Sequence, residues 1–138
     1  MMFETALLCL ALNVYHEARN QPTIGQIAVA QVVMNRVEDV RYPNDVCEVV
    51  RQGKHYLSGH PVKNQCQFSW YCDGKSDAMR NLAAAERAYE IAEFVLDGSA
   101  YGMFDGATHY HTDKVLPTWA SYKTFIVKIN DHIFYRWD

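Results

Sequence analysis

The feature that most constrains this chain is an apolar helical segment that ends at a single carboxylate. Residues 5–19 predict a helix, and Leu10, Val14 and Glu17 fall on one stripe of it because they are spaced by four and three residues. Glu17 therefore closes the apolar side of this helix. Partial burial at such a place raises the pKa of a carboxyl group, which is the property that a general acid needs near neutral pH.

Two other interpretations of Glu17 compete with this one. The side chain could pair with His16 or Arg19, or it could point into water at the helix end, as most glutamates do. Asn20 and Pro22 end the helix tightly and bring Glu17 close to the next helix, whose free N–H groups would lower the pKa of the carboxyl group. Burial and these N–H groups act in opposite directions, so the sequence leaves the net shift open.

Size and charge predict a single globular domain over residues 1–138. The chain is 49% hydrophobic, with only four Pro and seven Gly, which is enough for a core of its own. Its net charge of -3 comes from 16 acidic and 13 basic residues spread along the chain, unlike the basic stripe of a nucleic-acid-binding protein or a polybasic membrane anchor. We expect a monomer that binds neither nucleic acid nor membranes stably.

Hydrophobic periodicity and turn residues divide the rest of the chain into helices followed by strands. Thr23 and Gln26 have the spacing of a capping box that opens a second helix, and Asn44 is predicted to cap a third. Asn130 and Asp131 form the turn of a terminal hairpin. This order predicts an α+β domain. The further helices are expected at residues 23–37, 45–52 and 77–97, the strands at residues 108–111, 124–129 and 133–137, and a long loop or several short pieces at residues 53–74.

The apolar residues 6–12 are predicted to belong to a buried helix and not to a secretion signal. They follow Glu4 instead of a basic segment, lead into Glu17 without a cleavage site, and are too short to span a membrane. We therefore expect synthesis in the cytoplasm without a secretion signal.

The four cysteines leave more than one interpretation open. Cys9 lies inside the first predicted helix and is expected to be a small buried hydrophobic residue. Cys47, Cys66 and Cys72 lie in or beside loops, and one disulfide among them is expected in an oxidising space, with the pair left open. Their spacing does not match a zinc ribbon.

Several stretches of the chain form a recognisable series in their order and spacing: residues 17–30, 33–37, 42–44, 66–74 and 107–111, Trp119, and residues 132–136. Together, over nearly the whole chain, they resemble the SleB/CwlJ-type cell wall hydrolases. The family pattern around its acid, G-E-A-x-G-E-P, is matched here with His16, Asn20 and Gln21 in place of the two glycines and the second glutamate. Glu17 is therefore the only carboxylate that matches this motif.

The resemblance implies a lysozyme-like fold in which Glu17 faces a cleft walled by a small sheet. The implied substrate is the glycan strand of peptidoglycan, cut between N-acetylmuramic acid and N-acetylglucosamine, with Glu17 protonating the bridging oxygen. A lytic transglycosylase needs this one carboxylate, whereas a hydrolytic muramidase uses a second one. The candidates for a second carboxylate are Asp73, Asp105 and Asp113, and because each of them equally suits a turn, the sequence favours the transglycosylase.

The resemblance also places some polar and aromatic residues along the cleft. Gln67, Ser69 and Tyr110 could bind acetamido or hydroxyl groups of the glycan, or they could cap loop backbone and fill a strand core. Trp119 could stack on a sugar face, although burial under the hairpin explains it as well.

Two rival functions come from different classes. His109, His111 and His132 could hold a catalytic zinc ion, which would make an amidase that cuts the stem peptide from the sugar. A non-catalytic glycan-binding module is the other rival. The favoured function needs neither metal nor cofactor, has peptidoglycan as its partner, and predicts a phage endolysin that waits in the cytoplasm for a membrane lesion.

Overall fold

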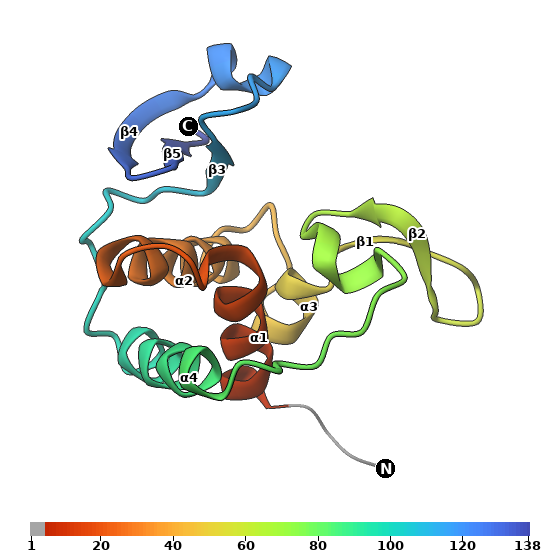
Figure 1. Ribbon diagram of the computed structural model, residues 1–138. Helices are drawn as coiled ribbons and strands as arrows, with labels where there is room; N and C mark the ends of the chain where they lie inside the picture. The colour runs from red at the N-terminus through yellow and green to blue at the C-terminus, as the bar shows by residue number, and fades with distance from the viewer. Residues whose placement is uncertain (1–4) are drawn as a thin grey trace.

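A computed structural model describes residues 5–138 and confirms the predicted α+β, lysozyme-like class. Glu4 lies outside the described residues, and no helix within residues 5–138 is long and apolar enough to cross a membrane. Figure 1 shows the helices in one body and a small sheet beside it. The elements in chain order are α1 (Ala6–Ala18), α2 (Thr23–Val37), α3 (Val46–Val50), β1 (Gly53–His55), β2 (Pro61–Cys66), the 3-10 helix η1 (Ser69–Cys72), α4 (Leu82–Leu96), β3 (His109–Thr112), the 3-10 helix η2 (Thr118–Tyr122), β4 (Thr124–Ile129) and β5 (His132–Arg136).

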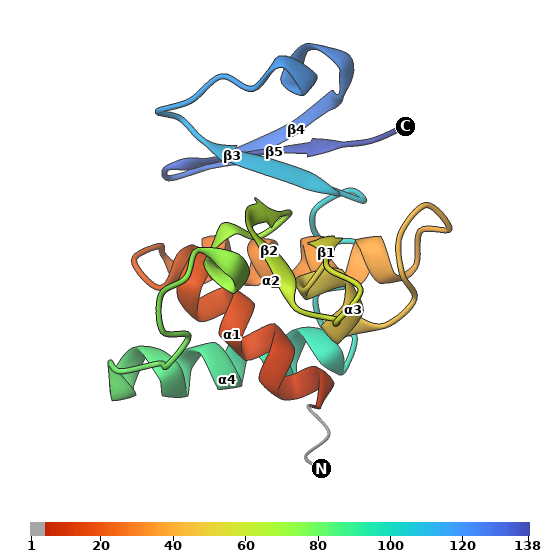
Figure 2. The ribbon, with the colours of Figure 1, turned by 90° about the vertical axis from the view of Figure 1, so that its right-hand side faces the viewer.

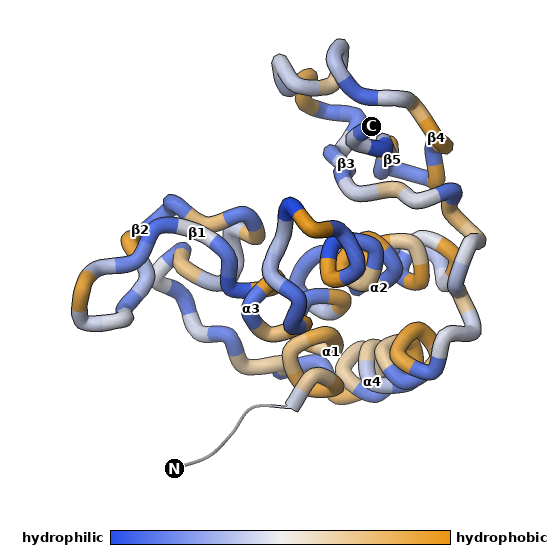
Figure 3. The backbone as a smooth tube through the Cα atoms, turned by 180° about the vertical axis from the view of Figure 1, so that it is seen from behind, coloured by the Kyte–Doolittle hydropathy of each residue, from blue (hydrophilic) through white to orange (hydrophobic). Residues whose placement is uncertain are grey.

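Helix α1 lies at the centre of the helical body. Leu10 and Val14 are fully buried in a core shared with Val33 of α2 and Ala92 of α4. Figure 3 colours the first turns of α1, nearest the N-terminus, as hydrophobic. The predicted apolar stripe is therefore the buried side of α1, and its last member, Glu17, lies where this helix leaves the core.

The three-stranded antiparallel sheet, in the order β3-β5-β4, forms a layer over α2 (Figure 2). Phe134 of the central strand is fully buried and packs in one cluster with Val29 of α2. Tyr110 lies opposite Phe134 in the β3–β5 pairing, and because paired residues share a face, both point toward the helices. His109 and His111 alternate with Tyr110 and so lie on the other face of the sheet.

The start of α2 differs from the predicted capping box. Pro22 is the N-cap, so Thr23 is already the first helical residue and makes no capping hydrogen bond. The side-chain amide of Gln26 donates instead to the backbone carbonyl of Gln21 at 2.9 Å. A side chain of α2 thus stabilises the bend between α1 and α2. The capping-box prediction was wrong.

Two later helices also begin at other residues than predicted. Asp45 caps α3 by accepting a first-turn N–H at 3.0 Å, a role that the sequence analysis gave to Asn44. Helix α4 begins at Leu82 and not at residue 77, with Asn81 as its N-cap. The N–H of Asn81 donates to the hydroxyl of Tyr15 at 3.0 Å, so tertiary contacts with α1 hold the preceding residues outside the helix.

Residues 53–74 consist of several short pieces. Strands β1 and β2 pair as an antiparallel hairpin, and η1 follows directly after it. The N–H of Gln67 donates to the carbonyl of Gln52 at 2.9 Å, which anchors the far end of the hairpin to the end of α3.

Both pairs of cysteines form disulfides. Cys66 and Cys72 join β2 to the end of η1, which is one of the pairings that the sequence left open. Cys9 is bonded to Cys47, with their Cα atoms 5.3 Å apart, so the expectation of an unbonded Cys9 was wrong. The reason is tertiary, since α3 packs against α1 and brings two cysteines 38 residues apart into contact.

The two disulfides should differ in their effect on stability. In the chain-entropy description, a bridge closing 38 residues contributes about 4 kcal/mol, and one closing 6 residues contributes about 2 kcal/mol. Replacing Cys9 and Cys47 by Ala should therefore lower the free energy of unfolding in urea more than replacing Cys66 and Cys72. Equal losses in the two double variants would contradict this prediction.

Candidate active site

Glu17 is held by a hydrogen bond between two distant parts of the chain. It lies in the last turn of α1, and its Oε1 accepts from the hydroxyl of Tyr110 on β3 at 2.6 Å. This distance is short for an O–H···O bond, as expected when the acceptor is a carboxylate. The sheet layer thereby fixes the orientation of the carboxyl group.

The pKa of the Glu17 carboxyl group is raised above its ordinary value of 4.5. The largest cause is burial, which disfavours the charged form, while the hydrogen bond from Tyr110 and the positive charge of Arg36 act in the opposite direction. From the sequence we expected the free N–H groups of the second helix to oppose the effect of burial. The opposing groups come instead from the sheet and from the far end of α2.

Two grooves meet at Glu17. The loop-side groove, of about 600 Å³, is bounded by η1 and the chain that follows it, and the sheet-side groove, of about 220 Å³, by the ends of β3 and β5. His16, Glu17 and Arg19 border both grooves. An extended polymer that lies along the two grooves would therefore place its middle at the carboxyl group. The loop-side groove is also lined by Tyr15, Ser69, Trp70, Asp73, Lys75 and Arg80, and the sheet-side groove by Gln21, Thr112, Asp113, Lys114, Asp131 and His132.

Comparison with known proteins identifies the family. The model of the family described as Cell Wall Hydrolase matches residues 20–135. The chain belongs to the cell wall hydrolase family. This matched segment begins three residues after Glu17, so it carries no information about that residue.

Related sequences and solved structures agree with the family. Spore cortex-lytic enzymes of Bacillus cereus and Halalkalibacterium halodurans are 28% and 32% identical over 91% of this chain, which spans 42% and 33% of their lengths. The catalytic domain of the germination-specific lytic transglycosylase SleB from Bacillus anthracis superimposes with a TM-score of 0.73, at 26% identity, over 98% of this chain and 97% of that one. The SleB catalytic domain of Bacillus cereus gives a TM-score of 0.62 at 23% identity, over 98% and 93%, and supports the fold alone.

In this cell wall hydrolase domain, the predicted binding residues lie in different places. Tyr110 contacts Glu17 directly, and the exposed Ser69 lines the loop-side groove. Gln67 is exposed and borders neither groove. Trp119 packs on the opposite face of the sheet, away from Glu17, with its ring 5.1 Å from that of His109.

The three candidates for a second carboxylate are also separated by the fold. Asp105 borders neither groove and forms an ion pair with Arg136 at 3.3 Å. Asp73 lines the loop-side groove, where its carboxylate accepts the backbone N–H of Lys75 at 2.9 Å. Asp113 lines the sheet-side groove and forms an ion pair with Lys128. Two of the three acids therefore remain within reach of a bound polymer.

The histidines proposed as zinc ligands do not converge. His109 and His111 lie on the outer face of β3, whereas the ring of His132 packs against Tyr110 on the inner face. Both nitrogens of His111 already have partners, the hydroxyl of Tyr135 at 2.8 Å and the carbonyl of Thr112 at 2.7 Å. Within residues 5–138, no group of three potential ligands is close enough to hold a metal ion, and the fold does not bring these three histidines together.

Two histidines that border the grooves were not predicted from the sequence to line a glycan-binding site. His16 stacks on Trp70 at a ring separation of 4.9 Å, and its Nε2 lies 2.8 Å from the carbonyl of Asp77. His132 is buried yet lines the sheet-side groove. Its Nδ1 has no hydrogen-bond partner in the described chain, and burial lowers its pKa. The only sequence signal for His16 was its replacement of a glycine in the family pattern.

Substituting Glu17 should make the folded domain more stable at high pH. Because burial raises the pKa in the folded state, Glu17 reduces stability progressively as the pH rises from about 4.5 through the raised value. At pH 8, Glu17→Gln should therefore unfold at a higher urea concentration than wild type, with a free energy of unfolding larger by on the order of 1 kcal/mol. At pH 4 the two proteins should unfold at the same urea concentration. Glu90→Gln, on the exposed side of α4, provides the control. A Glu17→Gln variant that gains nothing at pH 8 would show that the carboxyl group is solvated.

Proposed function

We propose that this domain cleaves the glycan strand of peptidoglycan between N-acetylmuramic acid and N-acetylglucosamine. The observation that carries the proposal is the position of Glu17, a half-buried carboxyl group with a raised pKa at the point where two grooves meet. A carboxyl group whose raised pKa lets it hold its proton to a higher pH than usual, and that an extended polymer can reach, has the properties of a glycosidase general acid. The Bacillus anthracis relative is named as a lytic transglycosylase, which supports the same substrate class.

In the proposed reaction, Glu17 gives its proton to the oxygen that bridges the two sugars. The bond from this oxygen to C1 of the muramic acid breaks, and the N-acetylglucosamine leaves with a free 4-hydroxyl group. The 6-hydroxyl group of the same muramic acid then attacks C1 and returns its proton to the Glu17 carboxylate. The product carries a 1,6-anhydro ring, and one carboxyl group has served as acid and then as base.

Tyr110 supports this cycle by holding the carboxylate in one orientation. Its hydroxyl donates to Oε1 of Glu17, and burial together with the Glu17 charge raises the pKa of the phenol well above its usual value. Tyr110 therefore stays protonated and remains a hydrogen-bond donor throughout the cycle. The other oxygen of Glu17 is left to face the substrate, since Tyr110 provides the only side-chain hydrogen bond to this residue among those described.

The transglycosylase is favoured over a hydrolytic muramidase because both remaining acids already have local partners. Asp73 accepts a backbone N–H of its own turn, and Asp113 pairs with Lys128. A muramidase would need one of them to activate water or attack the sugar. The phage-endolysin setting stays a prediction, since the relatives are named as spore enzymes.

The decisive measurement is mass spectrometry of the fragments released from purified sacculi. Wild type is expected to release muropeptides with anhydro ends, and Glu17→Gln should lower the release rate by about 10²- to 10⁴-fold because the proton donor is lost. Asp105→Asn, which removes a carboxylate outside both grooves, should release fragments at the wild-type rate.

The same assay separates the alternatives. Reducing ends, together with a large loss of activity in Asp73→Asn or Asp113→Asn, would identify a muramidase. Free stem peptides would identify an amidase. An unchanged rate of fragment release by Glu17→Gln would reject the role of Glu17 as the general acid. If wild type released no fragments from intact or stripped sacculi, the domain would be a non-catalytic glycan-binding module.

A further inference from the structure

Arg36 places a buried positive charge in the last turn of α2. Its side chain is only 5% exposed, and the guanidinium lies over the rings of Tyr42 at 5.1 Å and Phe68 at 5.3 Å. The Nε donates to the carbonyl of Thr108 at 2.7 Å, while the buried Nη1 has no hydrogen-bond partner within residues 5–138. None of the ion pairs between described residues includes Arg36. Burying a charge without an ion-pair partner is costly, so its retention here requires an explanation.

The surroundings of Arg36 lead to Glu17. Thr108, which accepts the Arg36 hydrogen bond, directly precedes β3, and two residues later Tyr110 contacts Glu17. Glu17 is the carboxylate whose negative charge acts on Arg36, and Arg36 in turn opposes the rise in the pKa of Glu17. The two groups are therefore the charged ends of one buried cluster, with Tyr110 between them in the chain of contacts.

The other charged groups near Glu17 lie along the open grooves. Water and salt screen charges at such positions far more than charges inside the protein. The buried guanidinium is thus the positive group with the strongest persistent effect on the carboxyl group. The remaining titratable or charged neighbours are His16 and Arg19 on α1, Asp73, Lys75 and Arg80 beside the loop-side groove, and Asp113, Lys114, Asp131 and His132 beside the sheet-side groove.

We propose that Arg36 is a positioning residue that supplies the internal counter-charge of Glu17. Its guanidinium stabilises the carboxylate that remains after the proton has moved to the glycan, and its hydrogen bond to Thr108 holds the strand that carries Tyr110. Burial alone would make the proton too hard to release, and the buried cation offsets part of this effect. This inference rests on the proposed role of Glu17 as the general acid.

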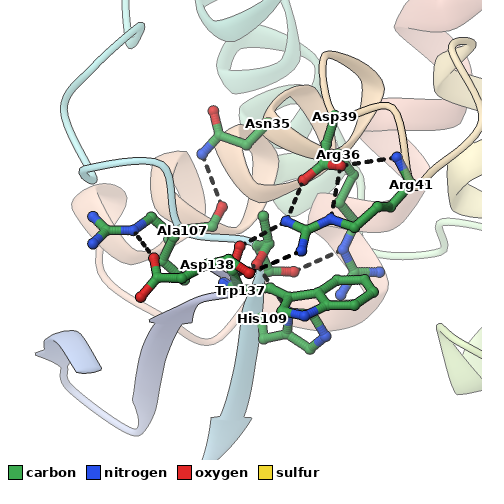
Figure 4. A network of polar contacts seen from close by, with 10 residues as sticks. Asn35, Arg36, Asp39, Arg41, Ala107, His109, Trp137 and Asp138 are labelled. Carbon is green, nitrogen blue, oxygen red and sulfur yellow. Dashed lines mark hydrogen bonds and ion pairs between the residues drawn. The ribbon is translucent and has the colours of Figure 1, made fainter. Parts of the chain in front are cut away.

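The neighbouring residue on α2 provides a matched control. Asn35 donates to the carbonyl of Ala107 at 2.8 Å, so it anchors the same segment as Arg36 without carrying a charge. Figure 4 shows Asn35 and Arg36 in one network with Ala107. Substituting each residue therefore separates the effect of anchoring β3 from the effect of the charge.

The test is a carbon-13 NMR titration of the Glu17 carboxyl group in four proteins: wild type, Arg36→Gln, Arg36→Lys and Asn35→Ala. Arg36→Gln removes the charge but keeps an amide that can donate to Thr108, and it should raise the pKa of Glu17 by about one unit. Arg36→Lys keeps the charge and should stay close to wild type, as should Asn35→Ala. Arg36→Met is a second neutral variant to be used if Arg36→Gln fails to fold, which its thermal unfolding reveals.

Activity provides a second readout. A general acid must be protonated, so the fall of kcat/KM at high pH should move upward with the pKa of Glu17 in Arg36→Gln, while the maximal rate drops about tenfold. A merely structural role would lower the rate without moving this limb of the pH profile.

Each possible outcome decides the question. An unchanged Glu17 titration in the neutral variants overturns the proposal, and so does an equal shift in Arg36→Gln and Arg36→Lys or a similar shift in Asn35→Ala. The titration needs no substrate, so its result is independent of the bond that is cut. Failure of the proposed function would appear instead in the fragments released by wild type and Glu17→Gln.

Discussion

The hydrogen bond between Tyr110 and Glu17 connects the two halves of this molecule. Glu17 belongs to the helical core through α1, and Tyr110 belongs to the sheet that covers α2. The 2.6 Å distance between the Tyr110 hydroxyl and Glu17 depends on two features of the sheet. Phe134 packs the sheet against α2, and the β3–β5 register points Tyr110 toward the helices. A shift of one residue in this register would turn His109 or His111 toward Glu17 and Tyr110 to the outer face. Packing of the sheet thus determines the chemistry at the end of α1.

The sequence was most informative where local pattern and burial coincide. The stripe through Leu10 and Val14 correctly predicted which side of α1 is buried and therefore where its terminal carboxylate lies. The terminal hairpin was equally predictable, because two extended segments flank a turn at Asn130, whose positive φ of 50° asparagine tolerates. These features depend on residues close in sequence, which is why periodicity and turn chemistry can identify them.

What could not be predicted depends on contacts between distant segments. The Cys9–Cys47 bridge needs α3 to pack on α1, and the late start of α4 needs Tyr15 to hold Asn81. Likewise, the role of Arg36 is invisible in its own helix, since both its anchor at Thr108 and its charge partner are far away in sequence. Sequence patterns thus suggested the acid, whereas its electrostatic environment required coordinates.

The departure from the family pattern at Gln21 has a physical explanation in the fold. The side-chain amide of Gln21 donates to the carboxylate of Asp131 at 3.2 Å, and its Oε1 accepts from the amide of Asn130 at 3.0 Å. It thereby connects the bend after α1 to the β4–β5 turn, beside the sheet-side groove that Gln21 and Asp131 line. A glutamate at this position could accept from Asn130 but would repel Asp131. The acid Asp131 is therefore compatible with the amide Gln21. Because Gln21 replaces the second glutamate of the family pattern, Glu17 is the only carboxylate in this stretch of chain.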